Sequence, residues 1–249
     1  MSSTHYLHYL LPIIPFLLLP TLSFSTCIVI LKTPNEIWVG ADSKRTIYQI
    51  DLNTGNVVET VNNEYCKIHK VGYFYFAVAG FDDEGNFNLA TESCLKYKSI
   101  TETIHYYQKM MVNHFEDIVE KYRVANRTRY IDRFVGSAIG QTAFFYFENN
   151  EPKIISLEFL TTNNPNEKVK VRLNRFNNEP ITVLGYGDHL NEPNPKVESF
   201  LKQGDNANAI RAMIQTEIIH HPNEIGGAID ILFLGNKNET WIARKKNCK

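Results

Sequence analysis

The chain has 249 residues and a formal net charge of −1, and 43% of its residues are hydrophobic and 12% aromatic. A chain of this length can bury a substantial core, and its composition excludes an intrinsically disordered protein. The balanced charge provides no basic surface of the kind that binds nucleic acid, so nucleic acid is not an expected partner. We expect a single folded domain.

The first 25 residues differ in kind from the rest. The stretch from Leu10 to Leu22 is nearly all Leu, Ile, Phe and Pro, and the small residues Ser23 and Ser25 follow it. A short apolar run followed by small residues at positions −3 and −1 is typical of a cleaved signal peptide. The run is also shorter than the roughly 20 residues that a membrane span needs.

We therefore predict that residues 1–25 are a signal peptide and that residues 26–249 form the mature domain, which is secreted or periplasmic. The mature protein would then meet a membrane only through its export signal. No Lys or Arg precedes the apolar run, which leaves an uncleaved membrane anchor through residues 10–22 as the alternative.

Export would place four cysteines where disulfides form: Cys27, Cys66, Cys94 and Cys248. Four cysteines allow three pairings, and the sequence does not choose among them. No C-x-x-C spacing is present, so the sequence predicts neither a structural metal nor a cofactor.

After Ser25, short runs of β-branched and aromatic residues alternate with turn residues, which predicts antiparallel strands. The expected strands are 26–31, 37–41, 47–50, 57–61, 66–71 and 73–79. The turn-rich residues 51–56 would join an exposed hairpin. We expect these strands to form one sheet that ends at Gly80.

Two helices should follow, the first opening with the carboxylates of residues 82–84. The second starts after Ser99, a plausible N-cap, and carries apolar residues at spacings of 4, 3, 4, 4, 3 and 4. These are Ile100, Ile104, Tyr107, Met111, Phe115, Ile118 and Tyr122. The stripe predicts packing against a sheet, whereas His105 and His114 lie off it and are expected in solvent.

The second half repeats this order of strands and then a helix. The expected strands are 135–147, 154–160, 169–173 and 181–184, the helix is 206–219, and the closing strands are 228–234 and 240–243. Two antiparallel sheets with helices outside them predict an α+β protein built as a four-layer αββα sandwich.

Cleavage after Ser25 would give Thr26 a free α-amine. Such an amine has a pKa of about 7.7–8.0 and can act as the general base that activates the hydroxyl of its own residue. An N-terminal threonine can therefore be a nucleophile without a separate histidine.

Several short motifs then occur in order: T-x-I-V from Thr26, G-A-D-S-K-R-T with Asp42 sixteen residues after Thr26, C-K-I-H-K-V from Cys66, A-V-A-G ending at Gly80, and G-G-A-I-D-I-L-F-L from Gly226. Together they resemble the proteasome β-subunit family of N-terminal nucleophile (Ntn) hydrolases. The match spans nearly the whole of the expected mature chain.

The resemblance implies a role for five residues. Thr26 would be the nucleophile, and Asp42 would orient Lys67, whose charge lowers the pKa of the Thr26 system. The backbone N–H of Gly80 would form the oxyanion hole. Thr46 would line the substrate cleft on an edge strand that binds peptide by β-augmentation. The lysine falls in place only with an insertion at the 51–56 hairpin.

The sequence departs from the family pattern near the double glycine. Where the family usually has an Asp and a Ser close to the terminal amine, this chain has Pro222 and Ile225. Tyr186 stands where a serine is expected between two glycines. Asn223 or Glu224 could replace the lost partner.

The resemblance implies an exported threonine-type amidohydrolase or peptidase that acts on a peptide or amide and needs no metal or cofactor. Ring-forming relatives make a homo-oligomer a candidate assembly. The alternative is a catalytically inactive, proteasome-like binding or assembly module, which the altered positions favour and the retained Asp42 and Lys67 disfavour. A third hypothesis, Cys27 as the terminal nucleophile, breaks the spacing to Asp42.

Overall fold

The structure is a computed structural model that describes residues 26–50, 57–81, 83–246 and 248. The predicted signal peptide, residues 1–25, and the predicted loop 51–56 lie outside the described residues. The described chain is a mixed α+β protein with three antiparallel sheets and five helices. Among those helices, none combines the length and apolar character that a transmembrane segment needs.

The first sheet contains β1, the first strand of the described chain. Its strand order is β10-β1-β2-β11-β12. The bounds are β1 Cys27–Lys32, β2 Glu36–Ala41, β10 Ile181–Gly185, β11 Asp230–Gly235 and β12 Glu239–Ala243. The predicted hairpin between β1 and β2 is confirmed.

The second sheet has the order β5-β6-β7-β8-β9. Its strands are β5 Ile68–Val71, β6 Phe74–Gly80, β7 Ala138–Glu148, β8 Glu151–Thr161 and β9 Val171–Asn177. Strands β3 (Arg45–Ile50) and β4 (Val57–Asn62) follow β2 in the chain and pair with each other as a separate two-stranded sheet.

The prediction that all strands before Gly80 form one sheet was therefore wrong. Strand β1 pairs with β10, and β2 pairs with β11, so strands from the far end of the chain occupy the places beside the first hairpin. The apolar pattern of a strand specifies which faces are buried but does not specify which strand lies beside it.

The helices are α1 Asp83–Lys96, α2 Ile100–Ala125, α3 Arg127–Arg133, α4 Pro195–Lys202 and α5 Asn206–His220. Helices α1, α2 and α5 were predicted, whereas the short α3 and α4 were not. Asparagine side chains cap these two short helices: Asn126 accepts the N–H of Arg129, and Asn194 accepts those of Lys196 and Val197. Ser99 is at the N-cap of α2, but its side chain makes no capping hydrogen bond.

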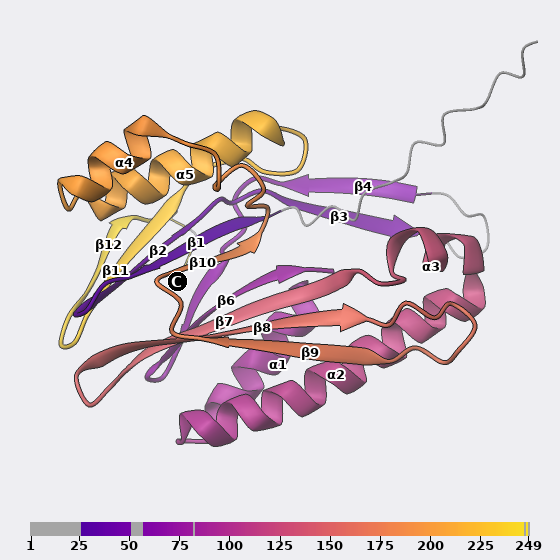
Figure 1. The fold of residues 1–249 in the computed structure, drawn as a ribbon. Coiled ribbons are helices and arrows are strands. Elements are labelled where there is room, and N and C mark those ends of the chain that lie inside the picture. The colour runs from indigo at the N-terminus through magenta and orange to yellow at the C-terminus, as the bar shows by residue number, and fades with distance from the viewer. Residues whose placement is uncertain (1–25, 51–56, 82, 247, 249) are drawn as a thin grey trace, which may run out of the picture.

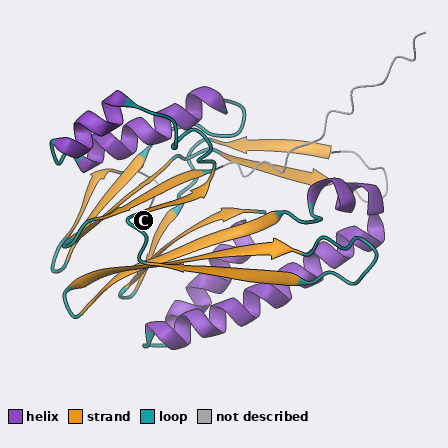
Figure 2. Cartoon of the chain, in the orientation of Figure 1, coloured by secondary structure: helices purple, strands orange, loops and turns teal. Residues whose placement is uncertain are grey.

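Figures 1 and 2 show the two larger sheets lying face to face. Helices α4 and α5 cover the outer side of the first sheet, and α1 and α2 cover the outer side of the second. Successive side chains of β1 point to opposite faces of the sheet and pack in two different cores. Ile28 and Ile30 pack between the sheets, whereas Cys27 and Val29 pack with residues of α5. A third core lies between the second sheet and its helices.

The apolar stripe of α2 faces the second sheet, as its spacing predicts. Ile104, Tyr107, Met111 and Phe115 are buried, and Val119, not Ile118, is the buried residue of the next turn. The phenyl ring of Phe115 lies so close to Gly140 of β7 that a Cβ there would stand 2.4 Å from it.

Candidate active site

Asp42 is the centre of a buried hydrogen-bond network at the end of β2. Its Oδ1 accepts Lys67 Nζ and the backbone N–H of Cys27, each at 2.7 Å. Its Oδ2 accepts the backbone N–H groups of Lys44 and Gly226, each at 3.1 Å. Four donors thus satisfy a carboxylate with no solvent exposure. Asp42 joins four separate segments, which a local turn residue would not do.

Lys67 is also buried, with 1% of its side chain exposed. It directly precedes β5 and follows Cys66, which forms a disulfide with Cys248. Lys70 lies on the opposite face of the same segment, as its odd spacing predicts. Its side chain is 48% exposed and pairs with Glu239 at 2.5 Å. Lys67 is therefore the lysine of this segment that contacts Asp42.

Thr26 directly precedes β1 and is buried. Its carbonyl oxygen accepts the N–H of Tyr186 at 2.8 Å. Gly185 has a φ of +80°, and a Cβ at this position would stand 2.0 Å from the Thr26 carbonyl oxygen. The N–H of Gly185 is in turn fixed by Gln141 Oε1 at 2.7 Å. Only glycine fits here, because both the dihedral angle and the close approach exclude a side chain.

Gly80 and Thr46 lie on other elements. Gly80 is the last residue of β6, pairs with Gly140 of β7 and has a φ of +117°. Thr46 is in β3 opposite Val61, and its hydroxyl is buried without a hydrogen-bond partner among the described residues. The structure thus joins Asp42 to Lys67 directly and to Thr26 through its neighbour, and it places the other two predicted residues at a strand end and in a hairpin.

The double glycine holds the segment that follows Asp42. The carbonyl of Gly226 accepts the N–H groups of Ser43 and Lys44 at 3.0 and 2.9 Å. Gly227 has a φ of +75°, and a Cβ there would stand 2.3 Å from Ser43 Oγ and 2.6 Å from the Asn63 carbonyl oxygen. In the sequence these glycines were part of a motif without an assigned role, and the structure gives them one.

The positions that depart from the family pattern have structural roles. The carbonyl oxygens of Pro222 and Asn223 accept Lys44 Nζ at 3.1 and 2.5 Å. Ile225 is fully buried in the core that also contains Cys27. An apolar side chain therefore occupies one of the places where the resemblance led us to expect a polar group.

The thiol of Cys27 is in an environment that suppresses its reactivity. Its side chain is fully buried. Burial, followed by the negative charges of Asp42 and Glu217, raises the pKa of this thiol well above its usual range. Because the thiolate is the reactive form, this environment disfavours the hypothesis that Cys27 is the nucleophile.

A pocket of about 370 Å³ lies elsewhere, between α4, α5 and the loop that precedes α4. His189, Glu192 and Met213 are among its lining residues, and neither Asp42 nor Lys67 is. The residues that the motifs select, Asp42 and Lys67, therefore lie in the buried network and not in this pocket.

No protein family model matches this chain, and no curated protein matches it. The geometry around Asp42 is therefore the main indication of function. It provides a buried lysine and carboxylate in contact, both tied to the segment that begins β1. Within the described residues, the one group of side chains with metal-ligand spacing, which includes His189, lies outside this network.

Proposed function

We propose that the chain is an exported threonine-type amidohydrolase or peptidase, with residues 26–249 forming a proteasome-like Ntn hydrolase domain. The observation that carries this proposal is the 2.7 Å contact between Lys67 Nζ and Asp42 Oδ1, both buried. The same carboxylate oxygen binds the N–H of Cys27, the residue after Thr26. A cation is thereby fixed next to the segment that carries the proposed nucleophile.

The architecture supports the same proposal. Three separate cores, one between the sheets and one under each pair of outer helices, are what a four-layer αββα sandwich of the Ntn hydrolase type would contain. Strand β1, which would begin at the mature N-terminus, lies inside the first sheet between β10 and β2. A nucleophile at its start would therefore be held by a rigid element.

The proposed reaction starts when export removes residues 1–25 and frees the Thr26 amine. The amine takes the proton of Thr26 Oγ1 as this oxygen attacks the carbonyl carbon of a peptide or amide. The carbonyl oxygen becomes an oxyanion that the Gly80 N–H stabilises, and one such donor is worth about 2.7–4 kcal/mol. The amine then protonates the leaving nitrogen, and water hydrolyses the resulting ester.

Lys67 and Asp42 would tune this reaction without bonding to the substrate. The positive charge of Lys67 favours the deprotonated forms of the neighbouring Thr26 groups. Asp42 fixes the position of that charge. In this scheme Lys67 and Asp42 are positioning residues, while Thr26 and Gly80 touch the reacting atoms.

The hairpin that carries Thr46 suits a peptide substrate. In the described structure, β3 pairs with β4 alone, which leaves its other edge open for an added strand. A peptide bound by β-augmentation along Thr46 would present its backbone carbonyl groups in extended form. The precursor would be inert before export and active after it, and the mature domain could assemble as a homo-oligomer.

A second candidate function is a catalytically inactive binding or assembly module. The buried Ile225 and the use of the Pro222 and Asn223 carbonyls by Lys44 favour it. Pro222 and Ile225 stand where the family pattern has polar groups near the terminal amine.

Analysis of the exported protein separates the two functions. N-terminal sequencing and intact mass should show a chain that starts at Thr26. This chain should hydrolyse members of a panel of fluorogenic peptide amides, Thr26→Ser should keep activity, and Thr26→Ala should abolish it without changing the circular dichroism spectrum. A chain that retains residues 1–25 or starts at Cys27, or unchanged hydrolysis by Thr26→Ala, would reject the threonine mechanism.

A further inference from the structure

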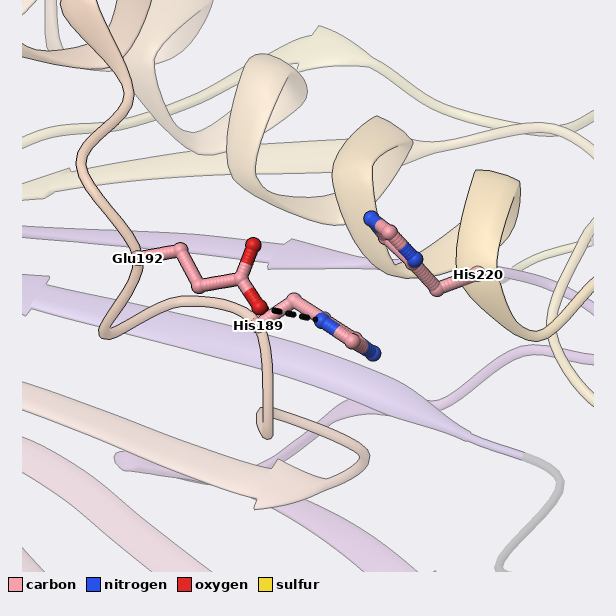
Figure 3. A group of neighbouring side chains, drawn as sticks. All are labelled: His189, Glu192 and His220. Carbon is pink, nitrogen blue, oxygen red and sulfur yellow. Dashed lines mark hydrogen bonds and ion pairs between the residues drawn. The ribbon is translucent and has the colours of Figure 1, made fainter.

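Two imidazoles and one carboxylate meet at the C-terminal end of α5. His189 and Glu192 are in the loop between β10 and α4, and His220 is the last residue of α5 (Figure 3). One ligand atom from each of the three side chains lies within 4.8 Å of the others. His189 Nδ1 is 2.9 Å from Glu192 Oε1, and the two imidazole rings stack with their centroids 3.7 Å apart.

The spacing and the types of these side chains suit a transition-metal ion. In a tetrahedral zinc site each N or O ligand lies about 2.0–2.2 Å from the ion, so ligand atoms are about 3.4 Å apart. The ligand atoms of His189, Glu192 and His220 lie within 4.8 Å of one another, so metal binding would require side-chain rotations, and Glu192 and His220 are exposed to solvent. Two imidazoles favour Zn²⁺ over Mg²⁺ or Ca²⁺, which prefer oxygen ligands.

The loop is already held in place for such a site. The N–H of His189 donates to Oε1 of Glu217, a fully buried side chain of α5, at 2.9 Å. The N–H of Glu192 donates to the His189 carbonyl at 3.2 Å, which closes a turn between the two loop ligands. Support of this kind around the ligands fixes their orientation.

A second observation points to a cation in the same place. Oε2 of Glu217 is buried and has no hydrogen-bond partner among the described residues. Glu217 lies about one helical turn before His220, and its Oε2 is 3.8 Å from His221 Nε2. One oxygen of this buried carboxylate accepts the His189 N–H, and the other has no hydrogen-bond donor among the described residues, so its negative charge near the cluster favours the binding of a positive ion.

We propose that His189, Glu192 and His220 bind one Zn²⁺-like divalent ion that ties the loop before α4 to the end of α5. The same loop begins at Tyr186, whose N–H donates to the Thr26 carbonyl. The ion would thus stiffen a segment attached to the start of β1. Its fourth coordination position would be open to water or to a small ligand.

Isothermal titration calorimetry on the full chain, after dialysis against EDTA, tests the site with ZnCl₂ alone and with MgCl₂ alone. We expect saturable binding of one Zn²⁺ per chain and none of Mg²⁺. His189→Ala and His220→Ala should each abolish that binding, and Glu192→Gln should weaken it. His105→Ala, which removes an exposed histidine of α2, is the matched control and should bind as the wild type does.

Three results would overturn the proposal: no saturable Zn²⁺ binding, binding that persists in both histidine variants, or an equal loss in His105→Ala. Circular dichroism establishes that each variant is folded, and a Co²⁺ titration adds an independent readout because tetrahedral Co²⁺ absorbs visible light. Hydrolytic activity is not measured in this experiment, so failure of the proposed hydrolase function would leave the result interpretable.

Discussion

Lys67 Nζ lies 2.7 Å from Asp42 Oδ1, and the two side chains are 1% and 0% exposed. Removing one partner of such a pair leaves an uncompensated charge in the interior, which is far more costly than losing a surface pair. The chain offers a comparison three residues away, because Lys70 and Glu239 form a pair at 2.5 Å that is 48% and 39% exposed.

Substitution of Lys67 should therefore destabilise the protein much more than substitution of Lys70. Lys67→Ala should lower the free energy of unfolding by about 3–5 kcal/mol, because Asp42 is left buried without its cation. Lys70→Ala should change it by less than about 1 kcal/mol, because an exposed pair contributes little. Urea unfolding followed by circular dichroism measures both, and equal losses would contradict the prediction.

If the proposed hydrolase function holds, substitutions at Lys67 and Asp42 should lower activity and a substitution at Lys70 should not. At a temperature where circular dichroism shows each variant folded, Lys67→Ala and Asp42→Asn should lower kcat on a peptide amide by about 100-fold, because the charge that favours the deprotonated forms of the Thr26 groups is lost or misplaced. Lys70→Ala should keep wild-type activity. An active, folded Lys67→Ala would remove this lysine from the mechanism.

Gly185 should tolerate no side chain, because a Cβ would meet the Thr26 carbonyl at 2.0 Å. Gly204 provides a control with a similar φ of +72° and nothing within 4 Å of its Cβ position. Gly204→Ala should lower the free energy of unfolding by about 1–2 kcal/mol, because alanine disfavours the left-handed backbone conformation. Gly185→Ala should cost about 1–3 kcal/mol more through overpacking. Equal melting temperatures for the two variants would show that the close approach is absent.

Local patterns predicted local structure well. The stripe on α2 predicted its buried face because that periodicity depends only on helical geometry, and the hairpin β1–β2 followed from two apolar runs around a short turn. The partition of strands between sheets was not predicted. Strands β10 and β11 come from the second half of the chain, and nothing within the β1 or β2 sequence selects them.

In the candidate site, too, only part of the arrangement could be predicted from the sequence. Its side chains, Asp42 and Lys67, were found from their motifs, and the structure places them in contact. The backbone donors of Cys27 and Gly226 were not found, because an amide N–H leaves no residue-type signal. Gly185 left only the weak signal of a glycine that follows a predicted strand.

The pairing of the cysteines, which the sequence left open, is a prediction of the structure. Cys66 and Cys248 form a disulfide across 182 residues, whereas Cys27 and Cys94 are buried free thiols. Peptide mapping of the unreduced protein should find this single bond and two thiols that are alkylated only after unfolding. A disulfide that contains Cys27 or Cys94 would contradict it.

Loss of this disulfide should destabilise the fold around Lys67. In the chain-entropy treatment a loop of this length contributes about 5 kcal/mol. The double variant Cys66→Ser with Cys248→Ser should therefore unfold at a much lower urea concentration than the wild type. Wild-type protein reduced before unfolding should match the double variant, and an unchanged midpoint in both would show that the bond contributes nothing.

The stability of the protein should fall in mildly acidic solution because of His69. Its ring packs against those of Phe76 and Phe87, with centroids 5.3 and 4.4 Å away, and its Nε2 is buried without a hydrogen-bond partner among the described residues. Burial lowers the pKa of His69 from 6.5 to about 4. The unfolded chain therefore binds a proton at a higher pH than the folded chain does, and protonation favours unfolding.

This difference predicts a loss of about 3 kcal/mol in the free energy of unfolding as the pH falls from 6.5 to 4. Glu120 adds a loss of stability at lower pH. A hydrogen bond from Arg123 lowers the pKa of this carboxyl from 4.5 to about 2, so the stability that the charged form provides is lost as the pH falls from 4.5 to 2. Urea unfolding at pH 7, 6, 5 and 4 should show a smaller decline in His69→Phe, which keeps the ring contacts, than in the wild type or in His105→Ala. A decline of the same size in His69→Phe would assign the acid sensitivity to other groups.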